Sequence, residues 1–257
     1  MCWRTIHPNE FGDWIECRNY LFDSYYLLGE KRDKKAKTIF SKFSAGVITN
    51  RETWAYNSSQ HKLSTNIERL IDFYNLQVNI YKQTTRNENS PKIQQVVSMD
   101  ERMIKWDEGL LGYASKGVLL KYKNADIRVG MYRPFFKQNL YFNEHLNWSR
   151  YLLPKLLPTK HHANLFICVV GNGTPKEFSV LMTDVTPDRQ LMANGQCFPL
   201  YWYDDSTADI ADLFSAPQNE EDKYVRRDGI TDWILSTARK QYGSKIDKED
   251  IFYYVYG

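Results

Sequence analysis

The stretch that most constrains the fold is residues 61–84, where apolar side chains recur at helical spacing. The recurring positions are Leu63, Ile67, Leu70, Ile71, Tyr74, Val78 and Tyr81. Steps of three and four residues place these side chains along one face of a helix, and such a face must be buried against other elements. We therefore predict a long helix over residues 61–84 that packs against a core.

Most other apolar stretches are short and typical of strands. The predicted strands cover residues 44–49, 54–57, 126–131, 139–142, 165–170, 178–185 and 198–203. Gly171-Asn172-Gly173 predicts a hairpin turn, and Pro134 predicts a loop or bulge within residues 132–137. Further helices are predicted over residues 13–28, 99–114, 206–214, 230–242 and 247–256, and a mobile loop over residues 215–228. Together these patterns predict an α+β fold with a mixed, mainly antiparallel β-sheet, packed helices and C-terminal helices.

The composition is that of a folded domain. The 257-residue chain is 42% hydrophobic and 15% aromatic, which is enough apolar material to bury a core. We expect one large domain over residues 1–257, or two tightly joined lobes. No apolar run is long enough to cross a membrane, and the first residues do not resemble a signal peptide, so we expect a cytoplasmic protein with no membrane partner.

The cysteines indicate buried thiols. Cys2, Cys17, Cys168 and Cys197 lie far apart with no Cys-x-x-Cys pair, and Cys168 falls within an apolar run. This spacing favours reduced thiols over a disulfide framework or a zinc site.

Charge is distributed unevenly. Residues 1–160 carry 25 lysines and arginines against 16 acidic residues, whereas residues 161–257 carry 9 against 15. We expect a basic sub-lobe over residues 1–160 and an acidic one over residues 161–257. The basic half includes a run of cations at Lys31, Arg32, Lys34, Lys35 and Lys37. Such a run is either a solvated linker or a surface that faces a polyanion.

Catalytic motifs are not found in the sequence. It lacks the Asn/Asp-Pro-Pro-Tyr motif of amino-methyltransferases, a glycine-rich S-adenosylmethionine turn and a phosphate-binding loop. Pro187-Asp188 with Glu221-Asp222-Lys223 matches a nuclease motif only loosely, because the last three lie in an acidic run rather than on an apolar strand. The adjacent His161 and His162 diverge on any regular element and have no third ligand nearby in sequence. We predict a non-catalytic chain without metal or cofactor.

Four sequence blocks resemble the C-terminal specificity region of type ISP restriction-modification enzymes and related helicase-methyltransferase fusions. The blocks, in matching order, are residues 11–14, residues 46–57 with 72–75, residues 132–135 with 140–142, and residues 198–201. Residues 248–257 are similar to a segment that continues further in that family. Because they end on an aromatic surface, we expect the chain to be a fragment of a larger protein.

The resemblance implies a DNA target-recognition domain. In that family one polypeptide joins a nuclease, an ATP-dependent translocase, an N6-adenine methyltransferase and a C-terminal recognition domain. The implied partners are double-stranded DNA and the upstream methyltransferase and helicase domains. Two alternatives stay open, namely a nuclease or methyltransferase fragment with its own activity, and a protein-binding structural module.

Several polar residues are candidates for DNA contacts. Asn50 and Arg51 follow a predicted strand, and their side chains have the geometry to bind adenine and guanine edges or a phosphate. Arg133 lies among aromatic residues, with Lys137 in the same segment. Lys31, Arg32, Lys34, Lys35 and Lys37 suit contacts with phosphates. The alternative is structural, with Asn50 and Arg51 at a packed corner and Arg133 held by carboxylates in a packed loop.

Overall fold

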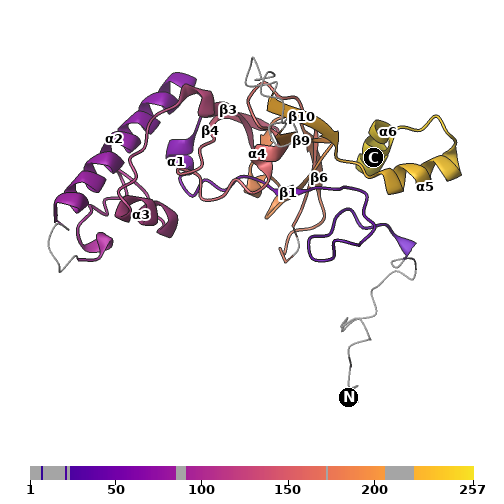
Figure 1. Cartoon of the computed structure of the whole chain (residues 1–257), viewed down its shortest axis with the longest axis horizontal. Helices are drawn as coiled ribbons and strands as arrows, with labels where there is room; N and C mark the ends of the chain where they lie inside the picture. Colours follow the sequence, from indigo (N-terminus) through magenta and orange to yellow (C-terminus); the bar gives the residue numbers. More distant parts are fainter. Residues whose placement is uncertain (1–6, 8–20, 22–23, 85–90, 172, 206–222) are drawn as a thin grey trace, which may run out of the picture.

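The computed structural model describes residues 7, 21, 24–84, 91–171, 173–205 and 223–257 (Figure 1). Its helices are α1 (Glu52–Ala55), α2 (Gln60–Thr84), α3 (Glu108–Ser115), α4 (Leu153–Leu156), α5 (Asp232–Tyr242) and α6 (Lys248–Tyr256), with 3-10 helices η2 (Ile93–Gln95), η3 (Asn124–Asp126) and η4 (Arg189–Met192). Its strands are β1 (Ser44–Ala45), β2 (Tyr56–Asn57), β3 (Ile127–Arg133), β4 (Phe136–Tyr141), β5 (Phe166–Val169), β6 (Val180–Thr183), β7 (Thr186–Pro187), β8 (Gln196–Pro199), β9 (Tyr201–Asp205) and β10 (Tyr224–Asp228). The predicted α+β class is confirmed.

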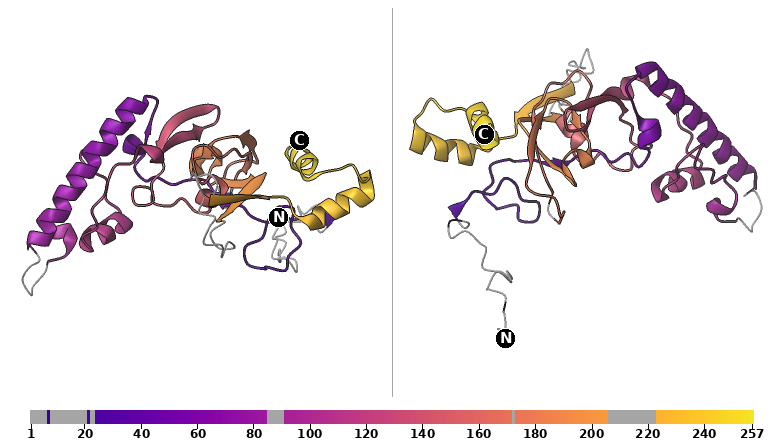
Figure 2. Two further views of the ribbon diagram at one scale, coloured as in Figure 1. Left: turned by 45° about the horizontal axis from the view of Figure 1, so that its top comes forward. Right: turned by 180° about the vertical axis from the view of Figure 1, so that it is seen from behind.

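Helix α2 confirms the long helix predicted from the apolar spacing. Leu63, Ile67, Tyr74 and Val78 are buried in one hydrophobic cluster, which also takes in side chains from α3 and the inner faces of β3 and β4. Helices α2 and α3 form a helical lobe at one end of the elongated molecule, and α5 and α6 lie at the opposite end (Figures 1 and 2). The sheets lie between the two ends.

Most strand pairs are antiparallel, as predicted. Within the described residues, one four-stranded sheet has the order β1-β8-β5-β6, another has the order β2-β4-β3-β7, and β9 pairs with β10. The pairing of β3 with β7 is parallel, which makes the β2-β4-β3-β7 sheet mixed. Because both four-stranded sheets combine strands from either side of residue 160, the expected basic and acidic sub-lobes are not separate folding units.

Two further hydrophobic clusters hold the sheets in place. One contains Val47, Leu140 and Phe166 and joins the two four-stranded sheets. The other contains Phe40, Phe198 and Phe252 and packs α5 and α6 against the β1-β8-β5-β6 sheet. The chain therefore has a continuous scaffold from the sheets to the C-terminal helices.

The hairpins and the C-terminal helices follow the sequence signals closely. β3 and β4 form a hairpin with a register shift between Met131 and Arg133, so the predicted bulge is confirmed. β5 and β6 form the second predicted hairpin. Thr231 caps α5 and Asp247 caps α6 through side-chain bonds to backbone amides. Cys168 and Cys197 are buried free thiols, as expected, on directly paired positions of β5 and β8.

Several predicted boundaries were wrong. The helix predicted over residues 99–114 begins only at Glu108, because Asp107 caps it there through the amide of Leu110. Residues 54–55 lie in the helical turn α1 rather than in a strand. The strand predicted over residues 198–203 is broken near Leu200, so that β8 and β9 belong to different sheets.

Three predictions fall wholly or partly outside the described residues. Residues 13–20 and 22–23 of the first predicted helix are not described, and the described end, residues 24–28, is not an α-helix, because Leu27 forms a bridge with Thr38. The helix predicted over residues 206–214 also lies outside the description. Of the loop predicted over residues 215–228, the described end is strand β10. Among the described helices, none combines the length and apolar character that crossing a membrane requires.

Candidate nucleic-acid interface

The β3–β4 hairpin brings together two of the predicted DNA-contacting residues. Arg133 ends β3 and Lys137 lies near the start of β4. The chain reverses at Pro134 and Phe135, and Phe135 takes a positive φ of 60°. A short antiparallel ribbon of this kind can enter a groove of duplex DNA.

The side chain of Arg133 is held on one edge and exposed on the other. Its Nη1 donates to the carbonyl of Tyr132 at 2.6 Å and to Oδ1 of Asp188 at 3.2 Å. The guanidinium carbon lies 3.9 Å from the centre of the Tyr132 ring. The side chain is 40% exposed, and no partner of Nε or Nη2 is found among the described residues. The stacked guanidinium is thus oriented in advance, with donors left for a ligand.

Asp188 is the buried anchor for this arginine. Besides Arg133, its carboxylate accepts from the hydroxyl of Tyr56 at 2.9 Å and from the amide of Gln190 at 2.8 Å. Burial raises the pKa of Asp188 although these partners lower it, and burial raises the pKa of Tyr56 well above its usual value. The network connects β2, the end of β3 and the start of η4.

This network occupies the aspartate of the loose nuclease motif. The Asp188 carboxylate is buried and occupied by protein donors, so it is not available to a metal ion in this conformation. Glu221 and Asp222 lie outside the described residues. Within the described part of the chain, no group of three or more histidine, cysteine or acidic side chains could hold a metal.

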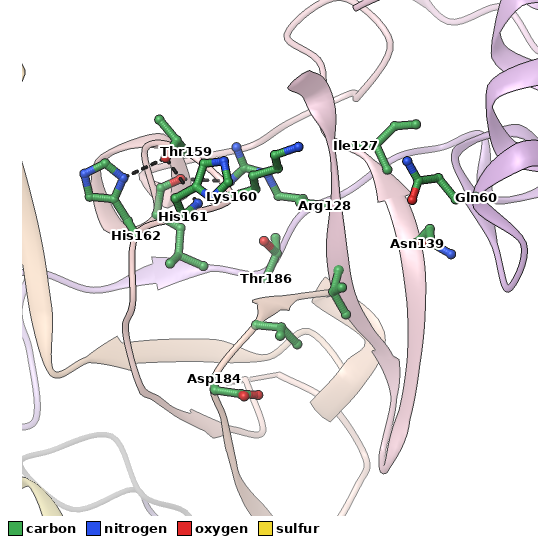
Figure 3. A pocket seen from close by; sticks show the side chains of 13 residues that line it. Gln60, Ile127, Arg128, Asn139, Thr159, Lys160, His161, His162, Asp184 and Thr186 are labelled. Atoms are coloured by element: carbon green, nitrogen blue, oxygen red, sulfur yellow. Dashed lines mark hydrogen bonds between the residues drawn. The ribbon is translucent and has the colours of Figure 1, made fainter. Parts of the chain in front are cut away.

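Lys137 pairs with an acidic residue that lines a cleft beside the hairpin. Its Nζ contacts Oδ1 of Asp184 at 2.8 Å, and this lysine holds the pKa of that carboxyl below its usual value. Asp184 lines a cleft of about 330 Å³. Figure 3 shows Lys160, His161 and His162 on one side of this cleft, with Ile127 and Asn139 of the hairpin on the other. Part of the hairpin therefore forms one wall of the cleft.

Arg128 also lines the cleft. Its guanidinium donates to the carbonyl of Leu157 at 2.8 Å and lies 4.2 Å from the centre of the Phe142 ring. Burial lowers its pKa to about 10. Sequence reasoning missed Arg128 and Lys160, because their proximity arises only when β3 packs beside residues 157–160. The two histidines, considered above as metal ligands, differ in environment, since His161 is exposed and His162 packs against Tyr203.

The predicted DNA contact of Arg51 is corrected by the structure. Its side chain is only 1% exposed, and Nη2 lies 2.7 Å from Oδ2 of Asp107. Nε donates to the carbonyl of Lys105 and Nη1 to that of Leu146. All three edges of the guanidinium face protein groups, so the structural alternative describes this residue. Through these bonds Arg51 links the helical lobe to the sheets.

The remaining candidates are not part of the hairpin. Asn50 is half-buried at a corner with φ 55°, a conformation that asparagine tolerates better than most residues. The five cations between Lys31 and Lys37 are exposed on an irregular segment, where Lys31 Nζ lies 4.7 Å from the centre of the Phe43 ring. In Figure 1 the indigo segment that contains this basic run is well separated from β3 and β4. The structure thus brings Arg133 and Lys137 together, and places the basic run elsewhere.

A family model described as the type ISP C-terminal specificity domain matches residues 38–257 of the chain. A search of curated proteins found no match. Among solved structures, the ATP-dependent type ISP restriction-modification enzyme LlaBIII bound to DNA is 27% identical with a TM-score of 0.75, covering 98% of this chain and 15% of that one.

Two further solved structures are similar. A nuclease-deletion mutant of the type ISP restriction-modification enzyme LlaGI, in complex with a DNA substrate mimic, is 28% identical with a TM-score of 0.74, covering 90% of this chain and 17% of that one. A complex of DrdV with DNA is 26% identical with a TM-score of 0.80, covering 100% of this chain and 24% of that one. The chain thus spans less than a quarter of the length of these relatives.

Proposed function

Because the chain belongs to the family of type ISP C-terminal specificity domains, we propose that it recognises a specific sequence in duplex DNA. The observation that carries the proposal is the similarity of almost the whole chain to part of the LlaBIII enzyme, which was solved bound to DNA. The hairpin surface adds a structural reason, since it presents an arginine that is anchored on one edge and open on the other.

The proposed mechanism assigns different tasks to the cations of the surface. Arg133 would contact a base edge, because a guanidinium with two free donors on one edge can bind O6 and N7 of guanine together. Lys137 and Lys160 would contact phosphates, which position the duplex without carrying sequence information. The Asp188 network would keep Arg133 in place and so reduce the entropy lost on binding.

The wider role concerns the parent polypeptide. We propose that this chain presents an adenine to an N6-adenine methyltransferase and controls the nuclease and ATP-dependent translocase of the same cytoplasmic enzyme. The chain itself would be non-catalytic and would bind DNA without metal or cofactor. Adding Mg²⁺ with ATP, or S-adenosylmethionine, to the isolated chain should yield no cleavage, ATP hydrolysis or methylation of DNA.

The primary test is a fluorescence-anisotropy titration of the chain with mixed-sequence duplexes at low and physiological salt, followed by selection and sequencing of the retained DNA. We expect an enriched motif and an affinity that falls as salt rises, because phosphate contacts release counterions. Absence of binding at both salt concentrations would instead support a protein-binding module.

The assignment of Arg133 is tested on the selected motif. Arg133→Ala should weaken binding by about 1–3 kcal/mol and relax the preference at one base position. The matched control is Arg226→Ala, because Arg226 also stacks on a tyrosine, 4.3 Å from the centre of the Tyr201 ring, but lies on β10. An unchanged motif for Arg133→Ala, or an equal loss for both variants, would remove Arg133 from the recognition site.

A further inference from the structure

Phe135 at the tip of the β3–β4 hairpin combines two unfavourable features. Its side chain is 86% exposed, more than any other large hydrophobic side chain in the described residues. Its φ of 60° lies in the left-handed region, where glycine is the usual residue and a bulky side chain is strained. A glycine or asparagine would form this turn more easily and would expose less apolar surface.

The Phe135 ring has no aromatic or cation–π partner in the described part of the chain. Tyr132 and Phe136 on either side of the tip, in contrast, contact each other at 6.4 Å between ring centres. Phe136 is itself 47% exposed, so the tip presents adjoining apolar surface. A strained, exposed aromatic residue on a well-held turn indicates a side chain kept for contact with a ligand.

The surroundings of the tip favour DNA as that ligand. Arg133 precedes the turn and Lys137 follows it, so cations flank the apolar tip on both strands. The buried Asp188 holds Arg133, and Asp184 holds Lys137, which limits the movement of the hairpin. Both acidic groups are already paired with these cations.

We propose that Pro134 and Phe135 form an apolar wedge that inserts between two adjacent base pairs of the bound duplex. The inference rests on the proposed function and adds a distortion of the DNA to it. Proline and phenylalanine are among the residues that wedge between base steps in other DNA-binding proteins, where the partly unstacked step kinks the duplex. Arg133 and Lys137 bind the bases and phosphates next to the inserted step.

The test uses the whole chain and the duplex enriched in the selection, with 2-aminopurine placed in turn at each position of the motif. Its fluorescence rises when a base is unstacked, so the wild type should raise the signal at one step. Phe135→Ala should abolish that rise and weaken binding about tenfold or more, the order expected from loss of one base–aromatic contact. Phe135→Leu should keep part of the rise, because leucine is also an apolar wedge.

Two further variants separate insertion from folding. Phe135→Gly relieves the positive φ, so its unfolding midpoint should equal or exceed that of the wild type while binding and the fluorescence rise are lost. Phe178→Ala is the matched control, since Phe178 is 79% exposed but lies outside this hairpin, and it should bind like the wild type.

The outcomes distinguish the wedge from the proposed function. If the wild type enriches no motif, the proposed function fails and the wedge fails with it. If the wild type enriches a motif but Phe135→Ala keeps its affinity and its fluorescence pattern, only the wedge is overturned, and Phe135 then serves a protein contact. Equal losses for Phe135→Ala and Phe178→Ala would also overturn it.

Discussion

The charged side chain of Arg51 is buried, and three protein groups contact it. The carboxylate of Asp107 lies 2.7 Å from Nη2, and the carbonyls of Lys105 and Leu146 accept from the other nitrogens. Burial lowers the pKa of Arg51, and Asp107 partly offsets this effect. An arginine in this position is stable only while all of its partners remain in place.

Arg51→Ala should therefore destabilise the fold strongly. It leaves Asp107 without its partner and two carbonyls without donors, and breaking a buried pair in this way costs about 3–5 kcal/mol. Urea denaturation followed by tryptophan fluorescence measures the change. Arg102→Ala is the control, because the ion pair of Arg102 with Asp100 is exposed, and its loss should leave the free energy of unfolding nearly unchanged. Similar values for both variants would contradict the role given to Arg51.

The raised pKa of Tyr74 predicts that the free energy of unfolding falls at alkaline pH. Burial raises its pKa from 10.0 to about 12, and its hydroxyl donates to the carbonyl of Val118 at 3.0 Å. The folded chain thus retains a proton that the unfolded chain loses above pH 10. The contribution of Tyr74 is fully present below pH 10 and is lost between about pH 10 and 12, at up to about 1.4 kcal/mol per pH unit.

The variant Tyr74→Phe tests this dependence. Near neutral pH it should be less stable than the wild type by about 1 kcal/mol, through loss of the hydrogen bond. Above pH 10 the difference should shrink and then reverse. Ile67→Val removes one methylene from the same core without a titratable group, so its deficit of about 1 kcal/mol should stay constant with pH. A constant difference for Tyr74→Phe across pH 8–11.5 would refute the prediction.

At the scale of residues, the sequence shows which functional group a side chain carries, but it does not show whether that side chain is buried or exposed. Arg51 and Arg133 each follow a predicted strand and each carry a guanidinium. In the structure, however, Arg51 is buried and Arg133 is partly exposed. The difference depends on Asp107 and Asp188, whose proximity is set by the tertiary fold. Phe135 could not be selected from the sequence either, because neither its φ nor its exposure follows from a Tyr-Arg-Pro-Phe pattern.

Gly46 allows two elements to approach closely. A Cβ at this position would lie 2.5 Å from the backbone oxygen of Asp188 and from the amide nitrogen of Arg189. The same approach is seen in the hydrogen bond from the amide of Val47 to the carbonyl of Pro187 at 2.9 Å. The segment directly after β1 therefore packs against the start of η4, where Asp188 anchors the hairpin.

Gly46→Ala should separate these elements and lower the free energy of unfolding by about 1–3 kcal/mol. Because Asp188 would shift with η4, the variant should also lose part of the base preference assigned to Arg133. The matched control is Gly112→Ala in α3, where a Cβ would meet nothing within 4 Å. There alanine should stabilise the helix by about 1 kcal/mol. Denaturation curves of the two variants should therefore move in opposite directions, and movement in the same direction would contradict this account.

At the scale of elements, strong local signals predicted well and contact-dependent boundaries did not. The apolar stripe of α2 and the cap at Asp247, with which α6 begins, are local, and both helices were predicted from the sequence. The 99–114 pattern is helical only from Glu108, because residues before Asp107 turn to meet Arg51 and the α2 core instead. Strands β8 and β9 are continuous in apolar character, but their separation into two sheets depends on partners elsewhere in the chain.

At the scale of the whole molecule, the boundary between the basic and acidic parts of the sequence does not coincide with a boundary in the fold. The excess of cations before residue 160 does not mark a separate lobe, because the sheets combine both halves. The cations proposed to contact DNA lie on two surfaces instead, namely the hairpin with its cleft and the separate basic run between Lys31 and Lys37. The resemblance in the sequence indicated the family correctly, whereas only the structure divides the candidate residues between these surfaces.

This division predicts that sequence preference and salt dependence can be changed independently. Replacing all five cations of the basic run with glutamine should reduce the slope of log affinity against log salt by about 0.9 for each cation that contacts a phosphate. The enriched motif should stay the same, because the run lies apart from Arg133. Anisotropy titrations at four or more salt concentrations, combined with the selection, measure both quantities.

The control exchanges lysine for arginine and arginine for lysine throughout the run, which retains every charge and should keep the slope. An unchanged slope in the glutamine variant would mean that the run is a solvated segment, and that the hairpin surface alone provides the electrostatic attraction. A changed motif would mean that the bound duplex reaches both surfaces through its bases. Only a lower slope with the same motif fits one surface that attracts the backbone and another that selects the sequence.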